Sequence, residues 1–133
     1  MCAPSRACLI TGVYATSLGN PHLRCEMTLP PFVQSYAKLL RDAGWFTANN
    51  VKTDYNLRDE TAFIRASWNR SDALAHWRQR PTGQPFFAVF NSEKSHESKI
   101  RARPHAPVHD PAKVRVPPYH PDTPEVRRDW AQY

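Results

Sequence analysis

The chain has 133 residues, 41% of them hydrophobic and 23% charged, a composition that excludes an intrinsically disordered chain and allows one small domain with a modest core. Its formal net charge of +6 favours an anionic partner or simply a basic solvated surface, but no zinc-finger or RNA-binding pattern accompanies it, so nucleic acid is not an expected partner. The three cysteines lack zinc-ligand spacing, and no apolar run is long enough to span a membrane.

Three elements are predicted in the first half of the chain. Residues 4–12 predict a short helix, with proline near its start and glycine at its end. Residues 30–44 have the three-four spacing of apolar side chains that is typical of a helix with one buried face, and Gly44 ends it. Residues 45–48 then predict a short strand, whereas residues 13–28 show no regular pattern.

The second half predicts two helices, one strand and a long loop. Ser71 is a candidate cap for a helix over residues 72–79. The apolar run at 85–90 predicts a strand buried on both faces of a sheet. Seven of the thirteen prolines fall within residues 104–124, which predicts an extended loop there. A last helix is expected over residues 123–133, where a threonine cap precedes a proline.

Helices that alternate with strands indicate an α/β fold. Two predicted strands do not make a stable parallel sheet, because parallel strands need neighbours and cover on both faces. The pattern therefore predicts further strands outside these residues, and we expect the chain to be a segment of a larger domain.

A cysteine and an arginine at the start of the chain suggest reactive chemistry. Cys2 lies just ahead of the predicted first helix, and Arg6 follows about one turn later. A helix N-terminus attracts anions through its unpaired N–H groups, and an arginine strengthens that attraction. These surroundings suit a nucleophile that attacks a substrate carrying an oxyanion. On these two residues alone, an accidental pairing is the simpler reading.

The longer string from Cys2 to Gly12 resembles the sulfatase family motif, Cys-x-Pro-Ser-Arg followed by an apolar pair and Thr-Gly, and matches every constrained position. The resemblance implies that Cys2 is oxidised to formylglycine by a formylglycine-generating or equivalent maturation enzyme. It also implies that the aldehyde hydrate is the nucleophile that attacks sulfur and then expels sulfate. Arg6 would anchor this group beside a metal ion.

Two further residues match the family by context. Lys52 lies where family members have a lysine that contacts sulfate, in a string similar to a bacterial branch related to N-sulfoglucosamine sulfohydrolase and the arylsulfatases. Many members have a histidine two residues later, where this chain has Asp54, so that histidine's role is dropped or taken by another group. His96 follows the predicted strand 85–90 and matches a histidine that contacts sulfate and protonates the leaving oxygen. Read without the family, Lys52 and His96 are ordinary surface residues.

The resemblance also implies a calcium ion, which the family holds through carboxylate and amide oxygens. Formylglycine at Cys2 would be one ligand, but this chain has no Asp-Asp pair, so the other ligands are expected outside it. The fold expected from the resemblance is an alkaline-phosphatase-like sulfatase domain, with helices around a mostly parallel sheet. Residues 1–133 would be a middle segment of that domain, without its N-terminal metal-binding strand and its C-terminal part.

The function implied is hydrolysis of a sulfate ester or sulfamate, with a sulfated small molecule or sulfated sugar as substrate. We expect the isolated segment to be inactive and the parent enzyme to be periplasmic or secreted, although this chain has no export signal of its own. Two alternatives stay open: a truncated reading frame that folds poorly, or a small non-catalytic basic protein that binds an anionic polysaccharide.

Overall fold

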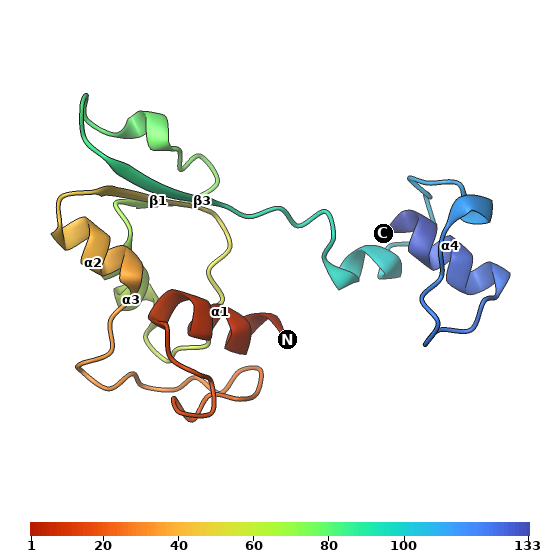
Figure 1. Cartoon of the computed structure of the whole chain (residues 1–133), viewed down its shortest axis with the longest axis horizontal. Coiled ribbons are helices and arrows are strands. Elements are labelled where there is room, and N and C mark those ends of the chain that lie inside the picture. Colours follow the sequence, from red (N-terminus) through yellow and green to blue (C-terminus); the bar gives the residue numbers. More distant parts are fainter. The chain divides into compact units, whose positions relative to one another are not determined.

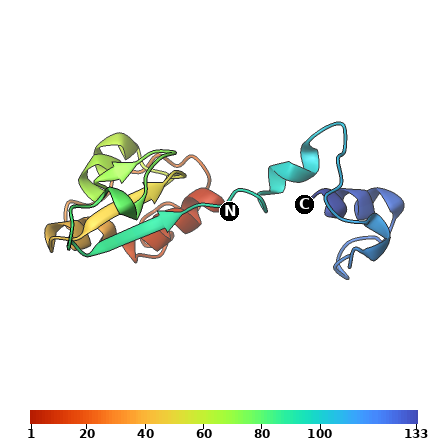
Figure 2. The same cartoon turned by 90° about the horizontal axis from the view of Figure 1, so that it is seen from above.

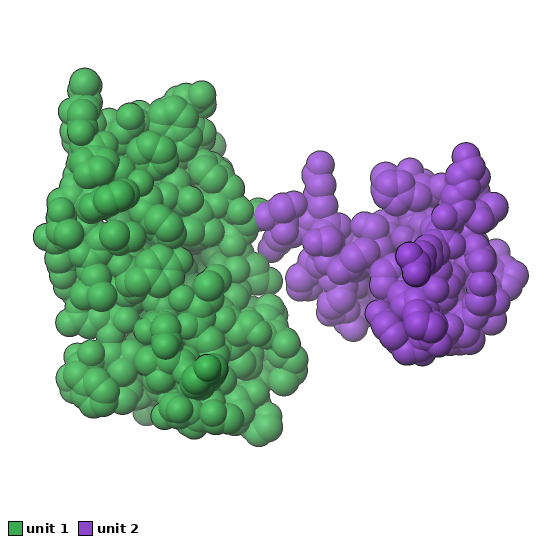
Figure 3. Space-filling view, viewed as in Figure 1, with its two compact units in different colours: residues 1–91 green, residues 92–133 purple.

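The computed structural model describes residues 1–133, which divide into two compact units, Met1–Asn91 and Ser92–Tyr133 (Figure 3). Each unit has its own helices and is described by itself. None of the helices is both long enough and apolar enough to cross a membrane.

Unit 1 is an α/β structure built on three short parallel strands. Its elements in chain order are α1 (Cys2–Thr11), α2 (Tyr36–Asp42), β1 (Phe46–Asn50), α3 (Glu60–Ser67), β2 (Arg70–Ser71), the 3-10 turn η1 (Trp77–Gln79) and β3 (Phe86–Phe90). The strand order is β2-β1-β3, and both pairings are parallel (Figures 1 and 2). The α/β prediction is confirmed, and its third strand is the two-residue β2, too short to be visible in the sequence pattern.

Helices α1, α2 and α3 cover one face of the sheet (Figure 1). The main hydrophobic core lies beneath them, where Phe87 and Val89 of β3 pack against buried residues of the helices and loops; the buried members are Ile10, Ala37, Tyr55, Leu57 and Trp68. Aromatic rings meet here, with Trp68 stacked on Phe87 at 6.0 Å between centroids. This core joins α1 to the loop after β1 and so positions the residues discussed below.

The opposite face of the sheet has a smaller core and more exposed rings. Phe46 and Ala48 of β1 are buried there with Ala75, as expected from the two-residue alternation of side chains along a strand. Turn η1 packs on this face, and its Trp77 stacks on Phe86. The prediction that β3 is buried on both faces is wrong, because Phe86 is 39% and Phe90 is 53% exposed.

Helix α2 begins later than predicted, whereas helix α1 ends where the sequence predicted. The helix expected from residue 30 begins at Tyr36, because Ser35 is its N-cap and accepts a hydrogen bond from the backbone N–H of Lys38 at 3.0 Å. The preceding residues 30–33 form a turn, in which the Val33 N–H donates to the carbonyl of Pro30 at 2.9 Å, and Phe32 is exposed rather than buried. Helix α1 ends at the predicted glycine, since Gly12 is its left-handed C-cap.

The helix expected over residues 72–79 is wrong, and a helix that was not expected is present. Ser71 belongs to β2, and the Asp72 carboxylate accepts the N–H of Leu74, which makes a turn in place of a helix start. The unexpected helix is α3, which has Asp59 as its N-cap and Glu60 in its first turn. Both residue types favour a helix start, so the sequence carries a local signal for α3.

Unit 2 contains two 3-10 turns, η2 (Glu97–Arg101) and η3 (Pro111–Lys113), and helix α4 (Pro124–Gln132). The predicted last helix is confirmed, with Thr123 as its cap and proline at its first position. The predicted extended loop is confirmed except for η3. Within the unit, Gln132 of α4 hydrogen-bonds the carbonyls of Lys99 and Ala102.

Candidate functional site

Cys2 is the first residue of α1, not a residue ahead of it as the sequence suggested. The helix packs tightly against the rest of unit 1, with Ala3 and Ala7 fully buried and Ile10 in the main core. Cys2 itself is partly exposed. The small buried side chains allow close approach of the helix, so its first turn is held at a fixed place beside the loop that follows β1.

Arg6 connects α1 to that loop. Its Nε donates to the carbonyl of Thr53 and its Nη2 donates to the carbonyl of Lys52, each at 2.5 Å. The guanidinium also lies 5.8 Å from the centroid of the Tyr55 ring. A planar guanidinium can bridge two neighbouring carbonyls in this way because its donors are fixed in a fork. The loop after β1 is therefore tied to the first turn of α1.

Asp54, the loop residue after Thr53, contacts Cys2. The Cys2 thiol donates to Oδ2 of Asp54 at 3.1 Å. The other carboxylate oxygen of Asp54 accepts from Nη1 of Arg24 at 2.5 Å. The Asp54 side chain is 18% exposed, whereas that of Arg24 is 68% exposed. We call these three side chains the Cys2–Asp54–Arg24 chain.

The surroundings of Asp54 lower the pKa of its carboxyl group. Partial burial alone would raise that pKa, but the hydrogen bonds from Cys2 and Arg24, and the positive charges of Arg24 and Lys52, outweigh it. The carboxyl group is therefore ionised at neutral pH, with a negative charge next to the thiol.

Left-handed backbone conformations occur in the two segments that carry Asp54 and Arg24. Four residues other than glycine have positive φ values, and all four belong to the two segments that meet here: Arg24, Glu26, Asp54 and Asn56. Such conformations are uncommon outside glycine and persist where surrounding contacts enforce them. One enforcing contact comes from Asn56, whose side chain accepts the N–H of Cys25 and donates to the carbonyl of His22.

Amide side chains occupy the carboxyl ends of the two longer strands. Asn91, directly after β3, donates to Oδ1 of Asn49 at 3.0 Å and to the carbonyl of Asn50. Asn49 in turn donates to the carbonyl of Lys52. A small cavity of about 90 Å³ borders Asn49, Asn91 and Arg6. Open α/β sheets place ligands at this end of their strands, so the cavity lies where the fold favours a site.

The predicted site residues divide between the two units. Unit 1 brings Cys2, Arg6 and the backbone of Lys52 together, and the Lys52 ammonium makes no hydrogen bond or ion pair. His96 belongs to unit 2, where it caps η2 and its Nδ1 accepts the N–H of Ser98. The structure therefore supplies no geometry between His96 and the other three residues.

Sequence reasoning missed two residues of the site and left a third without a role. In the sequence, Asp54 is marked only as a departure from the pattern of the family that the chain resembles. Arg24 has no sequence signal, because it lies in an irregular segment 30 residues before its partner. Asn56 had a weak one, since asparagine is enriched in left-handed conformations, but nothing in the sequence marks which asparagine adopts one.

The residues of this chain do not fit a calcium ion by themselves. Calcium takes six to eight oxygen ligands. Asp54 is the carboxylate at Cys2, and both of its oxygens already have partners. No group of three or more His, Cys, Asp or Glu side chains lies close enough to hold a metal ion.

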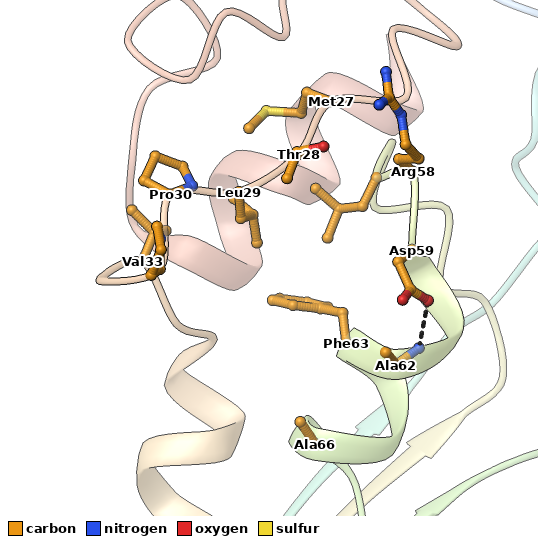
Figure 4. A pocket seen from close by; sticks show the side chains of 12 residues that line it. Met27, Thr28, Leu29, Pro30, Val33, Arg58, Asp59, Ala62, Phe63 and Ala66 are labelled. Atoms are coloured by element: carbon orange, nitrogen blue, oxygen red, sulfur yellow. Dashed lines mark hydrogen bonds between the residues drawn. The ribbon is translucent and has the colours of Figure 1, made fainter.

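A larger groove in unit 1 is structural in character. It has a volume of about 360 Å³ and lies between the segment 27–33 and α3, where Phe63, Ala62 and Ala66 form one wall (Figure 4). Only two charged residues border it, Arg58 and Asp59. The Asp59 carboxylate is occupied in capping α3 through the N–H of Ala62. The groove offers apolar contact but no group suited to catalysis.

Comparisons with known proteins give one informative match. No family model matches the chain. No solved structure matches it. The chain is 40% identical over 112 residues to an ulvan-active sulfatase from Formosa agariphila, a match that covers 75% of this chain and 18% of that protein. The chain thus spans less than a fifth of the length of the curated relative it matches. The match supports a sulfatase family, and the parallel α/β fold is consistent with part of an alkaline-phosphatase-like sulfatase domain.

Proposed function

We propose that this chain is a segment of a formylglycine-dependent sulfatase, with Cys2 as the residue converted to formylglycine. The observation that carries the proposal is the junction of α1 with the loop after β1, where Arg6 binds the carbonyls of Lys52 and Thr53 and Cys2 contacts Asp54. The likeness to an ulvan-active sulfatase supports hydrolysis of a sulfate ester or sulfamate as the reaction class.

The roles proposed for the side chains follow from their chemistry. Formylglycine, once made, supplies an aldehyde hydrate whose hydroxyl serves as nucleophile toward sulfur. Arg6 holds the loop in place and brings a permanent positive charge near residue 2. Lys52 has a free ammonium that is suited to contact sulfate. His96 is proposed as proton donor to the leaving oxygen on sequence context alone.

Several features belong to the complete enzyme and stay proposals. We place this chain as a middle segment of the catalytic domain and expect it to be inactive alone. The substrate class is a sulfated sugar or sulfated small molecule, and the parent is expected to be periplasmic or secreted. Any calcium would need ligands from other segments, since the residues here do not form its site. The comparison does not favour the alternative of a non-catalytic basic protein that binds polysaccharide.

The test is to co-express the chain with a formylglycine-generating enzyme and to measure peptide mass at Cys2 and turnover of a chromogenic aryl sulfate with calcium present. We expect formylglycine at Cys2 without turnover, because the site lacks metal ligands. C8A is the matched control, since Cys8 lies in the same helix, and it should be converted like the wild type. An unmodified Cys2 contradicts the formylglycine proposal, and turnover that survives in C2A contradicts the assignment of the nucleophile.

A further inference from the structure

Asp54 has contacts that the roles above do not use. One of its oxygens faces the Cys2 thiol at 3.1 Å, and the other is held by Arg24 at 2.5 Å. The residue also has a left-handed backbone conformation, with φ of 54°, which is uncommon for a residue with a side chain. The contacts and the backbone together fix where its carboxylate points.

The constraint comes from both sides of Asp54 along the chain. Arg6 holds the carbonyls of Lys52 and Thr53, the two residues before it. Immediately after it, the N–H of Tyr55 donates to Glu60 at 3.0 Å, and Tyr55 is buried in the main core. The carboxylate is thus anchored by its backbone neighbours and by Arg24, and its remaining acceptor is directed at the side chain of residue 2.

We propose that Asp54 is a positioning residue for the side chain of residue 2, with Arg24 as the group that holds Asp54 in place. This inference rests on the proposed function in one respect, namely that residue 2 becomes formylglycine. In the unmodified chain, the carboxylate accepts a hydrogen bond from the thiol. After conversion it accepts one from a hydroxyl of the aldehyde hydrate, and so fixes the orientation of both hydroxyls.

The chemistry involved is reversible addition of water to an aldehyde. The water oxygen bonds to the aldehyde carbon, a proton reaches the former carbonyl oxygen, and no electrons are exchanged with any other group. Only the hydrate has hydroxyl groups that donate hydrogen bonds, whereas the free aldehyde has an acceptor oxygen that a carboxylate repels. A carboxylate held at hydrogen-bond distance therefore favours the hydrate over the aldehyde.

The first experiment measures thiol reactivity in the unmodified 133-residue chain. Wild type, D54N and R24Q are treated with iodoacetamide at one fixed pH, and the alkylation rate of Cys2 is followed relative to Cys8 by peptide mass. The carboxylate holds the S–H group, so we expect the Cys2 rate to rise about three-fold or more in D54N and by a smaller factor in R24Q. D72N is the matched control, because Asp72 is also paired with an arginine but has no contact with Cys2. It should leave the ratio unchanged.

The second experiment uses the chain after co-expression with a formylglycine-generating enzyme. Carbon-13 in the cysteine β position distinguishes aldehyde from hydrate by NMR. We expect the hydrate-to-aldehyde ratio to fall about ten-fold in D54N relative to wild type and D72N. D54E keeps the carboxylate and should recover part of the ratio, which a purely structural role would not require. Thermal unfolding of each variant identifies any that fails to fold, and R24Q then replaces D54N.

The outcomes separate this inference from the proposed function. Formylglycine that forms in wild type and D54N with equal hydrate ratios overturns the role of Asp54 and leaves the sulfatase proposal intact. If Cys2 is not converted, the alkylation ratio decides alone: a rise in D54N with none in D72N supports the positioning role, and equal ratios overturn it.

Discussion

Arg6 joins α1 to the loop after β1 through two nitrogen atoms of one guanidinium. We expect R6A to lower the free energy of unfolding by about 2–4 kcal/mol, because two charge-assisted hydrogen bonds to carbonyls are lost. R6K should lose nearly as much, since an ammonium on a flexible stem does not reproduce the fork. Urea unfolding followed by tryptophan fluorescence measures both. R58A removes an exposed arginine as a control. An equal loss of unfolding free energy in R58A would contradict the contribution ascribed to the Arg6 hydrogen bonds.

Tyr55 is buried in the main core and its hydroxyl accepts a hydrogen bond from Nε1 of Trp68 at 3.2 Å. Burial raises the pKa of Tyr55, although the Trp68 hydrogen bond and the charge of Arg6 act in the opposite direction. A raised pKa means that the folded state holds the phenolic proton more tightly than the unfolded state. The stabilisation that comes from this raised pKa is therefore complete below the pKa of tyrosine in the unfolded state, about 10. It is lost as the pH rises through the pKa of Tyr55 in the folded state.

This linkage predicts the alkaline behaviour of the chain. On raising the pH above about 10, the tyrosinate absorbance of Tyr55 should appear together with unfolding rather than before it. Y55F should lower the free energy of unfolding by about 1 kcal/mol at neutral pH, through the unpaired Trp68 N–H, and should weaken its decline at alkaline pH. Y14F is the control, since Tyr14 is 80% exposed. Tyrosinate formation at Tyr55 in the fully folded chain would contradict the argument.

At this scale the sequence predicted pairs that are close along one helix and missed those that depend on backbone conformation. Pro4 and Gly12 predicted the helix that carries Arg6, and the spacing placed Cys2 about one turn from Arg6, although α1 begins at Cys2 rather than after it. Arg24 contacts Asp54 from an irregular segment in which both residues have left-handed backbones, and no local sequence pattern specifies such a pairing.

The hydroxyl of Ser35 caps the start of helix α2. The Ser35 hydroxyl is buried, caps the helix at Lys38 and contacts Ser67 Oγ of α3 at 2.6 Å. S35A should lower the free energy of unfolding by about 1–2 kcal/mol, through the lost cap and the lost contact with α3. Thermal or urea unfolding measures it, with S17A as the control at an exposed serine. A change no larger than that of S17A would show that the cap adds nothing.

Elements were predictable where periodicity and caps agreed. Helix α4 combined a threonine cap with proline at its first position, and it was found with nearly its predicted bounds. The helix expected over residues 72–79 had a cap candidate, but the Asp72 carboxylate accepts the N–H of Leu74 in a turn, and the Trp77 ring packs on Phe86 of the sheet. Tertiary packing overrode local propensity there, and a short apolar pattern does not reveal such packing.

The sheet of unit 1 has an unpaired edge at β3. Strand β3 pairs only with β1, and two of its phenylalanines, Phe86 and Phe90, are exposed. An exposed edge strand with apolar side chains promotes pairing with another chain. We expect concentration-dependent self-association, measurable by light scattering. F90K should reduce this association several-fold, because a lysine on the edge strand opposes strand addition. L74K, which alters an exposed leucine outside the edge, should change it less.

The contacts of α1 also set an order of events during synthesis. Arg6 binds carbonyls 46 and 47 residues further along the chain, and Cys2 meets a carboxylate 52 residues further along. A ribosome that adds about 5–20 residues per second needs roughly 2–10 seconds to make that stretch. During this interval α1 lacks both the carbonyls that Arg6 binds and the core residues that Ile10 packs against. The first residues are then available as a flexible peptide. An enzyme that reads Cys2 in its linear context would have those seconds in which to act, before α1 packs against the loop after β1.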